Sequence, residues 1–134
     1  MTNRVETSTP DGVMKPIGPY SHIARAGEFI MRSATAGVDP ATNELAGADV
    51  ASQTDRIMVS FERMLASVGS DIAHVLHINV FLKDMADFEE MNRAYARRIG
   101  DHRPARTAIA VMDLPKPGAR VTMNLTAVAA KDGS

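Results

Sequence analysis

Apolar residues recur at helical spacing in two segments of the chain. The first begins at Asp49 and ends near Gly69, and its apolar positions, spaced by 4, 3, 1 and 3 residues, are Ile57, Phe61, Met64, Leu65 and Val68. This stripe predicts an amphipathic helix, and a glycine commonly ends one. A second helix is predicted over residues 87–98, because Asp87 and Glu90 have the spacing of a capping box.

Other segments alternate between apolar and polar residues, which is the period of a β-strand. Residues 76–83 and 121–128 follow this pattern, and residues 107–112 predict a further strand. Residues 20–25 and 28–35 predict a hairpin that turns at Ala26 and Gly27. The predicted order is β-β-α-β-α-β-β. Two helices cover only one face of such a sheet, so the other face is expected to pack in an oligomer.

Composition indicates one globular domain over residues 1–134, with flexible ends at 1–14 and 130–134. The chain has 15 Lys plus Arg and 16 Asp plus Glu, a net charge of −1, which gives no electrostatic reason to expect a nucleic-acid or membrane partner. It contains no cysteine, which excludes disulfides and thiol nucleophiles and fits a cytoplasmic protein. We expect neither a signal peptide nor a membrane span, because no sufficiently long apolar run occurs.

The sequence contains no motif for a metal or a cofactor. Its four histidines are His22, His74, His77 and His102, and none has the spacing of a zinc site. No glycine-rich phosphate-binding or dinucleotide-binding motif occurs either. We therefore expect neither a bound metal nor a cofactor.

Two segments are candidates for chemistry. Arg106 follows Pro104 and Ala105 at the start of a predicted strand, where an arginine is suited to binding a carboxylate; the alternative is a surface salt bridge. The proline and glycine residues of segment 15–21 fix a loop that presents Tyr20, and the alternative is a rigid turn without chemistry.

These segments and two others together resemble one known family. Residues 16–21 (PIGPYS) resemble the N-terminal signature of the Rid family, also called YjgF and labelled L-PSP endoribonuclease or translation inhibitor. Residues 84–88 (DMADF), followed by Asn92 and Tyr95, resemble its second-helix signature. Residues 104–107 (PART) and 114–116 (LPK) complete the resemblance, which runs from about residue 15 to 129.

The resemblance implies a chorismate-mutase-like α+β fold, in which two helices pack on one face of a mixed sheet. It also implies a homotrimer with a central β-barrel and sites in the clefts between subunits. The implied reaction is cofactor-independent deamination of a small carboxylated imine or enamine to a keto acid. Arg106 matches the residue that binds the substrate carboxylate, and Tyr20, Ser33 and Phe88 match positions that line the pocket.

The chain departs from the family pattern where a glutamate on the final strand usually orients the attacking water. Thr122 stands in its place, and Asn124 replaces a second carboxylate. Threonine is no general base near neutral pH, but its hydroxyl can hold a water. Ala108 stands where several members have cysteine. His22 replaces a common glutamine and shares a strand face with Tyr20, so it is either a substitute base or a rim residue without a role.

The expected site therefore has two groups of residues. The catalytic candidates are Arg106, Thr122 and Tyr20. The substrate-binding candidates are Arg106, Ser33, Phe88, Asn92, Ala108, Asn124 and His22.

Three functions remain open. The first is a Rid-type deaminase of low or altered activity. The second is a pathway-specific enzyme for a different substrate, suggested by the changed polarity at Thr122, Asn124, Thr35 and His22. The third is a trimer that binds a metabolite without catalysis. The near-neutral charge and the few aromatic residues do not favour a ribonuclease.

Overall fold

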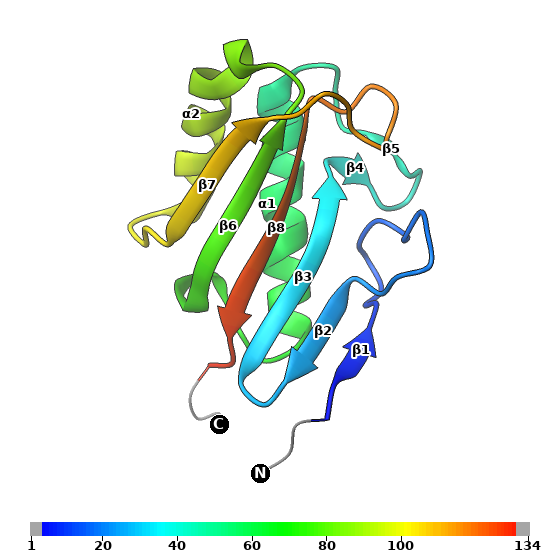
Figure 1. Cartoon of the computed structure of the whole chain (residues 1–134), viewed down its shortest axis with the longest axis vertical. Helices are drawn as coiled ribbons and strands as arrows, with labels where there is room; N and C mark the ends of the chain where they lie inside the picture. Colours follow the sequence, from blue (N-terminus) through cyan, green and yellow to red (C-terminus); the bar gives the residue numbers. More distant parts are fainter. Residues whose placement is uncertain (1–3, 131–134) are drawn as a thin grey trace.

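A mixed six-stranded sheet runs through the computed structural model, which describes residues 4–130 (Figure 1). The strands are β1 (Glu6–Ser8), β2 (Ile23–Ala26), β3 (Phe29–Ala36), β6 (Val75–Leu82), β7 (Ala105–Ala110) and β8 (Val121–Val128). Their order is β1-β2-β3-β8-β6-β7, and only the β6–β7 pair is parallel. A small second sheet pairs β4 (Val38–Asp39) with β5 (Glu44–Leu45).

Both helices, α1 (Val50–Ser67) and α2 (Phe88–Ile99), lie on the same face of the large sheet (Figure 1). The side chain of Asp49 caps α1 by accepting a hydrogen bond from the Ser52 N–H at 2.9 Å. The predicted apolar stripe is buried except at Val68, which packs against the core from a partly buried position. Short 3₁₀ turns, η1 (Ile72–His74) and η2 (Met85–Asp87), precede β6 and α2. The predicted arrangement of two helices on one sheet face is confirmed.

The register of the sheet decides which residues face the helices. Ile78 of β6 is fully buried against them, and it pairs with Arg106 of β7. The two neighbouring side chains therefore point to the helix face. Phe81 points the opposite way, and it pairs with Thr122 of β8. Arg106 and Thr122 consequently lie on opposite faces of the sheet in one chain.

The face away from the helices carries large apolar side chains exposed to solvent. Phe29 and Met31 of β3 are 57% and 53% exposed, and Ile109 of β7 is 47% exposed. Each alternates with residues that point toward the helices. We call this surface the open face.

The structure differs from the sequence-based prediction near the N-terminus. The first predicted strand, residues 20–25, begins only at Ile23, so Tyr20 and His22 are not on a strand. Residues 4–14, expected to be flexible, contain β1, paired with β2, and the buried residues Val13 and Met14. The predicted ends 1–3 and 131–134 lie outside the described residues. Within residues 4–130, no helix is long and apolar enough to cross a membrane.

Candidate functional site

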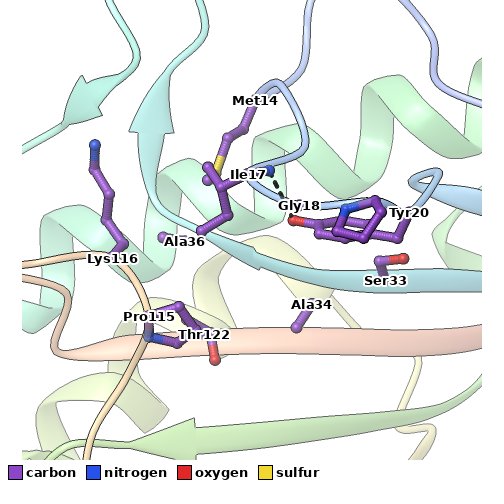
Figure 2. Close-up of a pocket in the computed structure, with 11 residues that line it drawn as sticks. Met14, Ile17, Gly18, Tyr20, Ser33, Ala34, Ala36, Pro115, Lys116 and Thr122 are labelled. Atoms are coloured by element: carbon purple, nitrogen blue, oxygen red, sulfur yellow. Dashed lines mark hydrogen bonds between the residues drawn. The ribbon is translucent and has the colours of Figure 1, made fainter.

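A pocket of about 600 Å³ opens beside β3 and β8, and we call it the Tyr20 pocket. The residues that line it include Met14, Ile17, Tyr20, Ser33, Lys116 and Thr122. Figure 2 shows Tyr20 and Ser33 on one side of it and Lys116 on the other. Three of the predicted site residues, Tyr20, Ser33 and Thr122, therefore lie in one pocket.

The loop that carries Tyr20 is fixed by local hydrogen bonds. The Tyr20 N–H donates to the Gly18 carbonyl at 2.9 Å, and the Tyr20 hydroxyl accepts from the Ile17 N–H at 3.3 Å. The Ser33 hydroxyl donates to the Ser21 carbonyl at 2.8 Å, which ties the loop to β3. The proline and glycine residues of this loop thus hold the tyrosine against the sheet, as their sequence predicted.

Thr122 contributes a polar group from β8 to the wall of the Tyr20 pocket. Its residue is 7% exposed, and it makes no side-chain hydrogen bond within the described part of the chain. No Asp or Glu lines the pocket. The hydroxyl can both donate and accept, so it can hold a water or a substrate oxygen.

Arg106 lies in a second, smaller pocket of about 300 Å³ at the β7 edge. Its guanidinium carbon is 4.8 Å from the centre of the Tyr95 ring and 5.8 Å from that of Phe88. No carboxylate pairs with it in residues 4–130. Two buried polar atoms that border this pocket, Asn92 Oδ1 and the Tyr95 hydroxyl, also have no hydrogen-bond partner among the residues that the structure describes. Arg106 is therefore a cation held by aromatic faces, with its charge available to an anion.

The remaining predicted site residues are not all close to these two pockets. Phe88 and Asn92 are beside Arg106. Ala108 packs against the core from the helix side of β7. Asn124 accepts a hydrogen bond from the Asn79 side chain at 3.0 Å. One chain thus divides the predicted site between the Tyr20 pocket and the Arg106 pocket.

The prediction for His22 is wrong, because it is neither a rim residue nor a residue on one strand face with Tyr20. Its side chain is fully buried. The Nδ1 atom accepts a hydrogen bond from Arg32 Nη1 at 2.7 Å, so the proton is on Nε2, which donates to the Met14 carbonyl. Burial, together with the Arg32 charge, lowers the pKa of His22 to about 4, although the Met14 hydrogen bond acts in the opposite direction. His22 is therefore neutral near pH 7.

Arg32, the partner of His22, is a buried cation that the sequence analysis missed. It is 2% exposed and also donates to the Ser33 carbonyl at 2.9 Å and the Ser60 hydroxyl at 3.2 Å. Burial lowers its pKa to about 10, and Tyr20 partly offsets this. Arg32 is in phase with the buried Ile30 on β3, and this spacing is the signal that could have identified it.

Gln53 is a second missed residue, and it organises the loops around the Tyr20 pocket. Its buried side chain donates to the carbonyls of Gly47 and Gly118, at 2.9 and 3.2 Å, and accepts from the Arg120 N–H at 2.7 Å. These bonds hold the loop that contains Lys116. The signal in the sequence is a polar residue four positions before Ile57, on the apolar side of α1.

Comparisons with known proteins identify the family and the fold of the chain. The model of the family described as Endoribonuclease L-PSP matches residues 12–129. A RutC family protein from Pyrococcus horikoshii is 37% identical over 118 residues, which cover 88% of this chain and 91% of that protein. The chloroplastic Reactive Intermediate Deaminase A of Arabidopsis thaliana is 30% identical, over 74% of this chain and 53% of that protein. The crystal structure of the Escherichia coli YjgF gene product superposes with a TM-score of 0.86 at 28% identity, covering 93% of this chain and 99% of that one.

Proposed function

The chain belongs to the endoribonuclease L-PSP family, which includes the YjgF, RutC and reactive intermediate deaminase proteins, and we propose that it hydrolyses a small carboxylated imine or enamine. The observation that carries the proposal is the Arg106 guanidinium, which is held over two aromatic rings without a carboxylate partner in the described chain. A cation of this kind suits the carboxylate of the substrate.

A neighbouring copy of the chain completes the site in this proposal. Arg106 and Thr122 are on opposite sheet faces, so one chain cannot present both to one small molecule. The exposed Phe29, Met31 and Ile109 give the open face an apolar surface that packing between copies would bury. A homotrimer closed through this face brings the Arg106 edge of one copy to the Tyr20 pocket of the next.

The proposed chemistry requires a held substrate and a positioned water. The enamine first gains a proton on carbon and loses one from nitrogen, which gives the imine. The water oxygen then bonds to the imine carbon, and one water proton passes to nitrogen, which gives a carbinolamine. The second proton moves from the carbinolamine hydroxyl to nitrogen as the carbon–nitrogen bond breaks, so that ammonia leaves and the carbonyl of the keto acid forms. Arg106 binds the carboxylate, the Thr122 hydroxyl holds the water, and Tyr20 and Ser33 shape the pocket.

One observation favours a second candidate, a trimer that binds the keto acid without turnover. The residues that line the Tyr20 pocket include no carboxylate, and the imidazole of His22 is buried behind its wall. No side chain there is suited to take a proton from water near neutral pH, and a bound ligand does not require one. Ligand binding without product formation would favour this function.

A coupled assay tests the proposal. A pyridoxal-phosphate-dependent threonine or serine dehydratase releases the enamine, and semicarbazide traps what is not hydrolysed. Adding this protein should lower the initial rate of semicarbazone formation. Arg106→Ala should raise KM by roughly tenfold or more, because it removes a charge-assisted hydrogen bond.

Arg97→Ala is the matched control, since Arg97 is an exposed arginine of α2 and lines neither pocket. It should behave as the unaltered protein. An unchanged KM in Arg106→Ala would contradict the carboxylate role, and unchanged trapping with the unaltered protein would exclude the deaminase activity on these substrates.

A further inference from the structure

The lining of the Tyr20 pocket includes one charged residue of the described chain, Lys116, and no Asp or Glu of residues 4–130. Much of the remaining wall is apolar, with Met14, Ile17 and Pro115 among its residues. A pocket of this composition suits a ligand with an apolar body and a negatively charged end.

Arg32 adds a second positive charge behind the wall of the pocket. Its three hydrogen-bond partners, the Ser33 carbonyl, His22 Nδ1 and the Ser60 hydroxyl, are all neutral, and its Nε has none. No carboxylate in residues 4–130 pairs with it. A buried charge without a counter-ion costs free energy, and a negative group in the adjoining pocket would offset part of that cost.

Lys116 lies where a second anionic group of a bound molecule would reach it. Its Nζ donates to the Asn43 carbonyl at 2.9 Å, which steadies the side chain and leaves two N–H groups for a ligand. It has no carboxylate partner in the described chain, whereas Lys83 pairs with Asp113 at 2.6 Å. Figure 2 shows Lys116 across the pocket from Tyr20. The Lys116 residue and the Tyr20 phenol are therefore at opposite ends of the pocket, and the ammonium group is at the outer end of the lysine side chain.

We propose that the Tyr20 pocket contains a second anion subsite, so that the preferred substrates are imines or enamines of dicarboxylic acids. This inference rests on the proposed function, in which Arg106 of a neighbouring copy binds the first carboxylate. Lys116 binds the second carboxylate directly, and the charge of Arg32 behind Ser33, on the other side of the pocket, adds to the attraction of the whole pocket for anions. The apolar wall accommodates the methylene groups between the two carboxylates.

Calorimetric titration with two stable product analogues tests the subsite. The probes are 2-oxobutanoate, which has one carboxylate, and 2-oxoglutarate, which has two. The unaltered protein should bind 2-oxoglutarate about fivefold or more tightly than 2-oxobutanoate, as expected for one added partly buried charge-assisted contact. Lys116→Met should abolish this preference, and Lys116→Arg should keep it.

Lys83→Met controls for the loss of one positive charge anywhere on the surface, and it should keep the preference. Equal binding of the two probes by the unaltered protein, or a preference that survives in Lys116→Met, would overturn the inference. In either case, Arg106-dependent binding of 2-oxobutanoate would leave the proposed function standing. Failure of both probes to bind would overturn both proposals.

Discussion

Mild acid should destabilise this fold through one buried imidazole, that of His22. In the folded chain Nδ1 accepts from Arg32, so a proton placed there would face a guanidinium group. Burial, together with this Arg32 charge, therefore holds the pKa of His22 at about 4 in the folded chain, against 6.5 for an unperturbed histidine. Between these values the unfolded chain binds the extra proton and the folded chain does not. The contribution to stability is complete above pH 6.5 and is lost as the pH falls toward 4.

The size of the effect follows from the two pKa values. A lowering of the His22 pKa from 6.5 to about 4 predicts that the unfolding free energy is about 2 kcal/mol smaller at pH 5 than at pH 7.5 because of this residue. Urea unfolding at several pH values between 4.5 and 7.5 measures this. The comparison is with His22→Gln, which can still accept from Arg32 and donate to the Met14 carbonyl but does not titrate.

The difference between the two proteins removes the contributions of the other titratable groups. Both are measured at one protein concentration, because oligomerisation would make stability depend on it. The free energy of the unaltered protein, minus that of His22→Gln, should fall by about 2 kcal/mol from pH 7.5 to pH 5. A constant difference across this range would refute the assignment of a neutral, buried His22 beside a charged Arg32.

Two further predictions concern packing. Gly37→Ala should lower the unfolding free energy by about 3 kcal/mol in urea unfolding, because a Cβ there would lie 2.2 Å from the Gln53 carbonyl oxygen. Gly27→Ala has open space for its Cβ but a φ of +61°, so it should lower the unfolding free energy by only about 1 kcal/mol. For the proposed trimer, Phe29→Asp should shift the sedimentation coefficient from the value of a trimer to that of a monomer, whereas Met85→Asp, at an exposed methionine in η2, should not. Equal losses in the glycine pair, or a trimer that survives Phe29→Asp, would contradict these predictions.

The hydrophobic periodicity of the sequence was sufficient to predict most elements of the fold. The helix around Phe61 and the strands at 76–83 and 121–128 were predictable because their periods are repeated several times. The N-terminal region was not, since β1 has three exposed residues and is defined by its pairing with β2. Val13 and Met14 are buried by distant contacts that no local pattern records.

The candidate site was harder to predict than the fold, because its residues interact across sheet faces and loops. Motif resemblance grouped Tyr20, Ser33 and Thr122 as site residues, and the three line one pocket. It did not show that Arg106 points to the opposite face, which depends on the pairing of β6 with β7. His22 was misplaced because a strand was extended three residues too far toward the N-terminus. Arg32 is a polar residue at a position of β3 where the strand period places a buried apolar one, and this pattern could have identified it from the sequence.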